Sequence, residues 1–195
     1  MAIISTLKAD VKAVKANDPA AKSYFDVLIN HAPLHAIMVH RFNHALYRAG
    51  VPILPRLFAN IIRVWSGVEI HPGARIGRGF FIDHGWGTVI GETAEIGDNC
   101  ILFQNITLGG TGKHSGKRHP SLGNNVYIGT QAILLGPITV GNNVKIGANT
   151  FIVMRDVPDN CTVVGNPGKI IKLNGKKADQ ELPKTDAPAD DFRQI

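Results

Sequence analysis

Aliphatic side chains recur at every sixth position through the central part of this chain. Thirteen of them form three phase-locked runs, and eight are followed directly by glycine. An amphipathic helix needs apolar residues every three or four positions and an amphipathic strand every second one, so neither explains a period of six. The period is typical of a solenoid, in which short units stack on one another. The runs are Ile70, Ile76, Ile82; Ile90, Ile96, Leu102, Leu108; and Leu122, Ile128, Leu134, Val140, Ile146, Ile152.

Three six-residue units return the chain to its starting direction if each unit makes one short flat face and one turn. This geometry stacks Leu122 on Val140 and Ile128 on Ile146, within a triangular prism. We expect the glycine after each anchor to serve a corner, where the backbone needs torsions that a Cβ resists. The sequence therefore predicts a mainly β fold, a parallel β-helix of hexapeptide repeats.

The repeat divides the chain into three parts. Residues 1–66 lack the period and read as helices, with Asp18-Pro19 expected to cap a helix and further helices from about Pro33 and Pro55. Residues 67–173 form the β-helix, interrupted by a loop at 109–121. Residues 174–195 are rich in Lys, Asp, Glu and Pro, so we expect a flexible carboxy-terminal tail. The helices are expected to cap the first coil and cover its open strand edges.

Composition excludes several classes of protein. The net charge is +6, but the basic residues are scattered and no nucleic-acid-binding module is recognisable, so nucleic acid is not expected as a partner. No apolar stretch approaches the roughly twenty residues of a membrane span, and no secretory signal is present. The two cysteines, Cys100 and Cys161, show neither a disulfide framework nor metal spacing. A cytoplasmic location fits best.

The period fails at two places, and both carry histidine and charged residues. It slips by two residues around 83–87, and it breaks between Leu108 and Leu122. Regular scaffolds often carry their functional groups where regularity fails, because an extruded loop can project over a coil. We therefore expect the chemistry of this chain at these two interruptions.

The interruptions also carry a family resemblance. The segments 69–79, 82–85 and 91–94, together with 107–113 and 117–120, resemble serine O-acetyltransferase, a hexapeptide-repeat acyltransferase, and the likeness covers about residues 17–172. The resemblance implies a left-handed β-helix. It also implies transfer of an acetyl group from acetyl-CoA, as co-substrate, to the hydroxyl of L-serine in cysteine biosynthesis, with no metal expected.

By resemblance, His84 is the general base of this reaction. A hydroxyl is a poor nucleophile at neutral pH, so a base must take its proton, and an unperturbed histidine has a pKa near 6.5. A carboxylate on the far ring nitrogen would orient the imidazole. The resemblance assigns that role to Glu69, where many relatives have Asp. The alternative for His84 is a histidine in a turn that bonds only to the backbone. The alternative for Glu69 is an ordinary surface carboxylate.

The resemblance also implies the residues that hold the two substrates. Around serine it places Asp18, Asp83, Arg118 and His119, with the acidic pair near the ammonium and Arg118 suited to the carboxylate. Asp18 has a rival role as a helix cap, and 118–119 could be a solvated basic loop. The pantetheine arm is expected in a groove between adjacent subunits, near backbone groups of Gly110, Thr130 and Ala148. The phosphates are expected near Lys113 and Lys145.

Partners follow from the same resemblance. A homotrimer is expected, and a dimer of trimers is possible, although the helical region is shorter than in the family's longer members. The chain ends in Ile195, as expected for insertion into the active site of O-acetylserine sulfhydrylase. Trp86 is bulkier than the residue many relatives have beside the base, and it either reshapes the serine pocket or covers the coil.

Three other functions compete with this interpretation. One is another hexapeptide-repeat acyltransferase, with homoserine or a sugar as acceptor. The second is a β-helical zinc carbonic anhydrase, which would recruit ligands among His71, His84, His114 and His119, although no ligand set presents itself. The third is a structural or partner-binding β-helix without catalysis.

Overall fold

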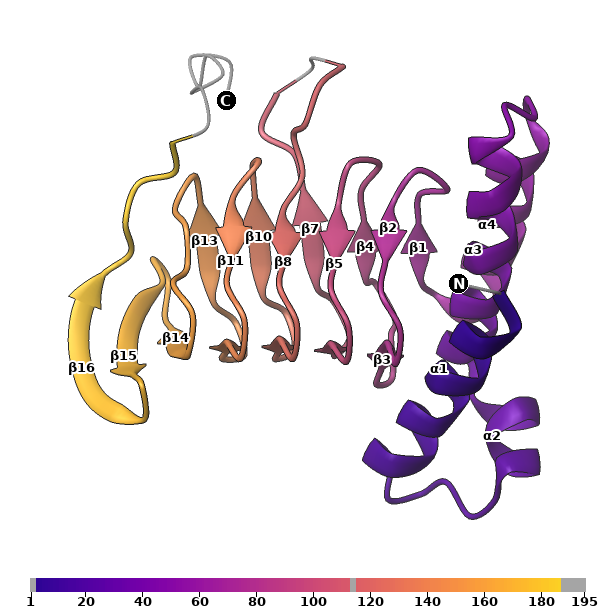
Figure 1. Cartoon of the computed structure of the whole chain (residues 1–195), viewed down its shortest axis with the longest axis horizontal. Coiled ribbons are helices and arrows are strands. Elements are labelled where there is room, and N and C mark those ends of the chain that lie inside the picture. Colours follow the sequence, from indigo (N-terminus) through magenta and orange to yellow (C-terminus); the bar gives the residue numbers. More distant parts are fainter. Residues whose placement is uncertain (1–2, 113–114, 187–195) are drawn as a thin grey trace.

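The protein consists of a helical region packed against one end of a parallel β-helix (Figure 1). The computed structural model describes residues 3–112 and 115–186. Within these residues, four helices come first and sixteen short strands follow. The helices are α1 (Ile3–Asn17), α2 (Tyr24–Asn30), α3 (Ala32–Arg48) and α4 (Leu54–Ser66).

The strands form three sheets, because each coil contributes one strand to each face in turn. Sheet A holds β1 (Glu69–Ile70), β4 (Val89–Ile90), β7 (Thr107–Gly109), β10 (Ile133–Leu135) and β13 (Phe151–Val153). Sheet B holds β2 (Arg75–Ile76), β5 (Glu95–Ile96), β8 (Ser121–Leu122) and β11 (Thr139–Val140). Sheet C holds β3 (Phe81–Ile82), β6 (Ile101–Leu102), β9 (Tyr127–Ile128), β12 (Lys145–Ile146), β14 (Cys161–Val164), β15 (Lys169–Leu173) and β16 (Lys176–Glu181).

The six-residue anchors form the core of the prism, as the period predicts. Leu122 pairs with Val140 and Ile128 with Ile146 in neighbouring parallel strands, which confirms the predicted stacking. All the anchors are buried except Ile76, which is half-buried in the edge strand of sheet B. The predicted mainly β fold with an amino-terminal helical region is therefore confirmed.

The glycines after the anchors have a different role from the one expected. None of these eight has a positive φ; the left-handed residues are largely asparagines, such as Asn99 and Asn125, two residues further on. The glycines are required because successive coils approach closely. A Cβ at Gly97 would lie 2.5 Å from the carbonyl oxygen of Gly123 in the next coil. Asparagine tolerates left-handed torsions better than other residues with side chains, and here Asn125 also donates to Asn143 at 3.0 Å.

The helical region is fixed to the first coil by a buried ion pair. The Arg41 guanidinium of α3 donates to both carboxylate oxygens of Asp10 in α1, at 3.2 Å each, and also to the carbonyl oxygens of Ile76 and Gly77. Asp10 in turn accepts from the backbone N–H of Phe80. Burial raises the Asp10 pKa, while the neighbouring Arg41 opposes that shift. One charged pair therefore joins two helices to the end of the prism.

The expected helix cap at Asp18 is wrong. Helix α1 ends at Asn17, and Asp18 instead accepts a hydrogen bond from the Ala20 N–H at 2.7 Å in the connection to α2. The cap of α2 is Ser23, whose hydroxyl accepts from the Asp26 N–H at 3.1 Å. The sequence signal misled because an Asp-Pro pair serves a turn as well as a helix start.

The expected flexible tail from residue 174 is also wrong over its first part. Strands β15 and β16 form an antiparallel hairpin, and both residues of the Asn174-Gly175 turn have positive φ. An Asn-Gly pair favours this type of two-residue hairpin turn. The side chain of Leu182 is buried at the end of the hairpin, and Lys169 pairs with Glu181 at 2.9 Å. Residues 187–195, with Ile195, lie outside the described residues.

Candidate active site

The first interruption of the repeat extrudes His84 from the prism. It lies in the turn between β3 and β4, where His84, Gly85 and Gly87 all have positive φ, between 60° and 75°. A Cβ at Gly85 would lie 2.7 Å from Val68 and 3.0 Å from Pro33, so the turn is pressed against the start of α3. The His84 side chain is 75% exposed as a result.

His84 has a carboxylate neighbour, but it is not the one expected. The Nε2 atom of His84 lies 3.8 Å from the Asp83 carboxylate, beyond direct hydrogen-bonding distance. Glu69 instead forms an ion pair with Arg63 of α4, at 2.8 Å. Within the described part of the chain, no ion pair joins Glu69 to His84. The expected pair is therefore not formed, because Arg63 in the last turn of α4 competes for the carboxylate.

Asp18 and Asp83 come together around His31, although they are 65 positions apart in the chain. Burial lowers the His31 pKa, and the two carboxylates oppose that shift by electrostatic attraction. The ring is held by the helix it caps, since Nδ1 accepts from the Leu34 N–H at 3.1 Å. The predicted acidic pair thus lies near one half-buried imidazole, beside the turn that carries His84.

Trp86 does not cover the coil. It is 67% exposed, and its indole lies across the α-carbon of Gly67, where a Cβ would be 2.6 Å from the ring. Gly67 ends α4 in a left-handed conformation and accepts a backbone hydrogen bond from Gly87. The indole therefore forms a fixed apolar surface two residues from His84.

The second interruption is the loop between β7 and β8, which projects from the prism (Figure 1). Its returning strand is tied to the coil before it through Thr93. The Thr93 hydroxyl accepts from the backbone N–H groups of Arg118 and His119, at 3.0 and 3.1 Å. Lys117 donates to the carbonyl oxygen of Thr93 at 2.6 Å. The side chains of Arg118 and His119 are thus fixed on a rigid base.

Arg118 is paired with Glu92 of the same coil as Thr93. The guanidinium Nη2 donates to one carboxylate oxygen, and the Tyr47 hydroxyl of α3 donates to the other at 3.0 Å. The hydrogen bond from Arg118 lowers the Glu92 pKa, so this carboxylate stays ionised at neutral pH. The helical region is therefore linked to the second interruption through Glu92.

His119 is neutral and has a defined tautomer. It is only 8% exposed, and burial, with Arg118 nearby, lowers its pKa to about 4. Its Nδ1 accepts from the Thr93 backbone N–H at 3.2 Å, so the hydrogen of the neutral ring is on Nε2. The ring lies against Gly91, where a Cβ would be 2.0 Å from Cδ2. His119 is therefore suited to donate a hydrogen bond and not to accept a proton.

The residues predicted for the acetyl donor divide between two edges of the prism. Thr130 and Ala148 lie in successive turns from sheet C to sheet A, the same kind of turn that carries His84. Gly110 lies in the turn from sheet A to sheet B, against Arg118. Lys145 is exposed on β12 of sheet C, and Lys113 lies outside the described residues.

The two interruptions therefore lie on different edges of one chain. His84 lies on the edge between sheets C and A, and Arg118 with His119 lies on the edge between sheets A and B. We call these the His84 edge (turns 83–88, 103–106, 129–132 and 147–150) and the Arg118 edge (turns 71–74, 91–94, 110–120 and 136–138). Sheet A separates them.

The chain resembles known acyltransferases in sequence. A family profile described as bacterial transferase hexapeptide (six repeats) matches residues 119–153. The serine acetyltransferase of Bacillus subtilis (strain 168) is 52% identical over 192 residues, covering 97% of this chain and 88% of the relative. That of Synechococcus elongatus is 49% identical over 189 residues, covering 95% of this chain and 77% of the relative.

This chain belongs to the serine acetyltransferase family. Solved members of the family share its fold. The serine acetyltransferase of Neisseria gonorrhoeae superposes with a TM-score of 0.86 at 43% identity, over 90% of this chain and 67% of that one. A soybean serine acetyltransferase in complex with serine gives a TM-score of 0.83 at 41% identity, over 87% and 69% of the two chains. The chain thus spans about two thirds of the length of these solved structures.

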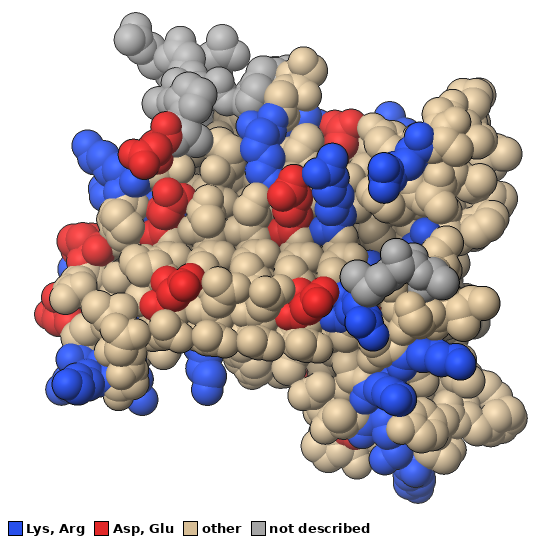
Figure 2. Space-filling view, viewed as in Figure 1, with Lys and Arg blue, Asp and Glu red and all other residues tan. Residues whose placement is uncertain are grey.

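Two absences hold for the described residues of this family member. None of its helices in the described ranges has the length and apolar character needed to cross a bilayer. Residues 3–112 and 115–186 also contain no group of three His, Cys, Asp or Glu side chains placed to hold a metal ion. On the face seen in Figure 2, positive and negative side chains mix over the β-helix.

Three structural partners at the site were not assigned by sequence reasoning. Glu92 and Thr93 were noted only within a motif, yet they hold Arg118 and His119. Their position offered a signal, since they follow anchor Ile90 as the loop follows anchor Leu108, one coil later. Tyr47 gave no signal, because nothing in its helix indicates which coil it contacts.

Proposed function

We propose that this chain transfers an acetyl group from acetyl-CoA to the hydroxyl of L-serine. The observation that carries the proposal is an exposed imidazole, His84, held on a strained turn beside Asp83, which with Asp18 lies near His31. Its relatives are named serine acetyltransferase over nearly the whole of this chain, and one solved member of the family is a complex with serine. The product is O-acetylserine, a precursor for cysteine biosynthesis.

The reaction needs one proton to move from the acceptor. His84 takes the proton of the serine hydroxyl while the oxygen attacks the thioester carbon, and the tetrahedral intermediate then expels CoA as a thiolate. The protonated imidazole returns the proton to the departing sulfur. General base catalysis of this kind contributes about 10²–10⁴-fold. A backbone N–H near the Gly109-Gly110 turn is suited to stabilise the oxyanion.

A carboxylate orients the imidazole in this proposal. Glu69 is the candidate, since it is released from Arg63 at little expense: both side chains of that pair are about half exposed, and exposed pairs contribute only ~0.2–1 kcal/mol. Asp83 is the alternative, at 3.8 Å from Nε2. The two are distinguished by substitution, as described below.

Serine is recognised by charge at both ends. Arg118 binds the carboxylate through its guanidinium fork, and the neutral His119 donates a second hydrogen bond from Nε2–H. Asp18 and Asp83 bind the ammonium on the other side.

The division of these residues between two edges supports a shared active site. In a homotrimer, the His84 edge of one subunit faces the Arg118 edge of its neighbour, so each site takes the base from one chain and the carboxylate-binding residues from another. The pantetheine arm lies in the groove between them, near Thr130 and Ala148 on one side and Gly110 on the other. Lys113 and Lys145 are the proposed phosphate partners.

Three finer proposals concern the protein in the cell. We place the enzyme in the cytoplasm, where acetyl-CoA and serine are both available. Ile195 is proposed to enter the active site of O-acetylserine sulfhydrylase, and pairing of two trimers is proposed through the helical region.

An acceptor panel tests the proposed function. Purified protein with acetyl-CoA is given L-serine, L-homoserine, L-threonine or a sugar, and release of the CoA thiol is followed. We expect release with L-serine and at least tenfold less with every other acceptor. Equal or faster release with another acceptor would replace serine as the substrate. No release with any acceptor, alongside stoichiometric zinc, would favour the carbonic anhydrase.

A further inference from the structure

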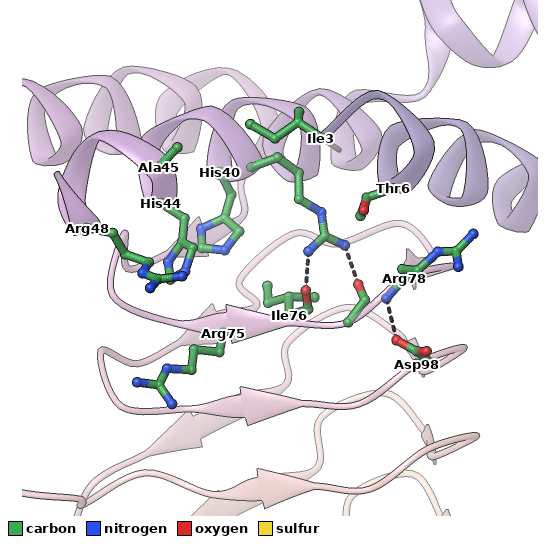
Figure 3. A pocket seen from close by; sticks show the side chains of 12 residues that line it. Ile3, Thr6, His40, His44, Ala45, Arg48, Arg75, Ile76, Arg78 and Asp98 are labelled. Atoms are coloured by element: carbon green, nitrogen blue, oxygen red, sulfur yellow. Dashed lines mark hydrogen bonds between the residues drawn. The ribbon is translucent and has the colours of Figure 1, made fainter. Parts of the chain in front are cut away.

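A cavity lies away from both interruptions of the repeat, where the helices meet the first coil. Its volume is about 610 Å³, within the range of small-molecule sites, and it is bounded by α1, α3 and the edge strand β2 (Figure 3). Four arginines and a single carboxylate line it: Arg41, Arg48, Arg75, Arg78 and Asp98. The cavity is therefore rich in positive charge, although apolar side chains also line it.

Two of these side chains have fixed structural roles. Arg41 is held by Asp10 and by two backbone carbonyl oxygens, so it forms a rigid wall. The Asp98 carboxylate accepts from the Arg78 backbone N–H at 2.7 Å, which orients it along the turn. Neither group needs to move when a ligand enters.

Arg48 and Arg75 have guanidinium groups that a ligand can engage. Within the described part of the chain, Arg48 has no hydrogen-bond or ion-pair partner for its side chain. Arg75 lies 3.6 Å from Glu95, but its side chain is 76% exposed, so the pair is weak. Figure 3 shows Arg48 and Arg75 on the same side of the cavity, one from the helix and one from the coil, with Arg78 on the other side.

The cavity wall also carries a polar atom without a partner. His40 is almost fully buried, and its Nδ1 has no hydrogen-bond partner among the described residues. Burial lowers the His40 pKa to about 3, so the ring is neutral. An unsatisfied buried acceptor is unfavourable. The Nδ1 atom of His40 is thus a buried polar group that the described residues leave unsatisfied.

We propose that this cavity is a second binding site, for a small molecule that carries phosphate groups, with Arg48 and Arg75 as the principal ligands. A guanidinium group can donate two parallel hydrogen bonds to the oxygens of one phosphate. Two guanidinium groups on different elements therefore favour a ligand that can bind both at once. Arg78 adds positive charge at the far end. Because the two forks come from α3 and β2, the bound molecule strengthens the contact between the helical region and the β-helix.

Thermal unfolding and calorimetric titration of the full chain with inorganic pyrophosphate test this site. At 150 mM NaCl, we expect saturable binding and a raised melting temperature. The double variant Arg48→Gln/Arg75→Gln should weaken binding by about tenfold or more, since each lost charge-assisted contact has roughly that effect. The matched control Lys172→Gln/Lys177→Gln removes the same charge from the hairpin at the other end. It should bind pyrophosphate as the parent does.

Several results would overturn the proposal. The first is that the parent protein does not bind pyrophosphate at this ionic strength. The second is that the arginine double variant binds pyrophosphate as tightly as the parent. The third is that citrate, which carries carboxylates instead of phosphates, raises the melting temperature as much as pyrophosphate does. The acceptor panel tests acetyl transfer independently of pyrophosphate binding. The arginine double variant should retain the parent's turnover with serine, because neither arginine belongs to the proposed catalytic site.

Discussion

The carboxylate of Glu69 is bound by Arg63 at 2.8 Å in this structure, and not by the imidazole of His84. Glu69 begins the first strand of sheet A, and Arg63 lies in the last turn of the helix before it. The proposed partner of the catalytic base is therefore held by a half-exposed arginine in this structure.

Removing Arg63 should raise activity. Because an exposed pair contributes only ~0.2–1 kcal/mol, Arg63→Gln should increase kcat by up to about fivefold by freeing Glu69. Glu69→Gln should decrease kcat, and Glu69→Asp should retain part of it. Steady-state kinetics with serine and acetyl-CoA check these results. If Glu69→Gln keeps the parental kcat, Glu69 does not orient His84. Asp83 is then the candidate for that role, and kcat of Asp83→Asn tests it.

His84→Ala should abolish most turnover without unfolding the chain. The side chain is 75% exposed, so its loss removes little packing, while base catalysis is worth about 10²–10⁴-fold. The measurement is kcat, together with the melting temperature. His44→Ala, a histidine of α3 outside the site, serves as the control and should keep the parental rate. Similar rates for both variants would remove His84 from the mechanism.

Gly67→Ala should destabilise the protein more than Gly50→Ala. Both glycines have φ above 70°, so both substitutions carry a similar backbone strain. Only at Gly67 would the new methyl group also meet the Trp86 indole, at 2.6 Å, whereas Gly50 has open space. We expect an additional loss of ~1–3 kcal/mol in the free energy of unfolding and a shifted tryptophan emission. Equal losses would show that the indole position is not fixed by Gly67.

The stability of the fold should fall as the pH decreases from about 6.5. The pKa of His119 is lowered to about 4 and that of His40 to about 3, so the unfolded chain binds their protons first. The stability that these two neutral histidines contribute is therefore fully present above pH 6.5 and is lost below it, by up to about 1.4 kcal/mol per pH unit for each histidine. In denaturant titrations between pH 6 and 5, His119→Gln should reduce the slope of the unfolding free energy against pH by the contribution of one protonating group. An unchanged slope would contradict the neutral state of His119.

The period of six predicted the stacking of the coils correctly because that stacking depends on a repeated local pattern. The same pattern misassigned the glycines, since close approach and positive φ both select glycine and only coordinates separate them. The hairpin around residues 174–175 was not predicted because its second strand, β16, is almost entirely polar, although the Asn-Gly pair is typical of a hairpin turn. Local turn chemistry deserved more weight than composition there.

At the site, sequence reasoning found the two interruptions and did not foresee how they relate in space. Counting the anchors in threes would have separated them, because His84 follows the third anchor, Ile82, and the loop with Arg118 follows Leu108, which lies on the same face as Ile90. The contacts of Tyr47 with Glu92 and of Arg63 with Glu69 depend on how the helices pack on the first coil. Such packing between distant segments has no periodic signal.

Mixing two inactive variants tests the shared active site most directly. His84→Ala and Arg118→Ala chains are each inactive in the proposed mechanism. In a randomly mixed trimer, however, about a quarter of the sites combine an intact His84 edge with an intact Arg118 edge. After co-expression in equal amounts, we predict recovery of roughly a quarter of the parental serine-dependent thiol release. Activity no higher than the sum of the two separate variants would contradict a site built from two subunits.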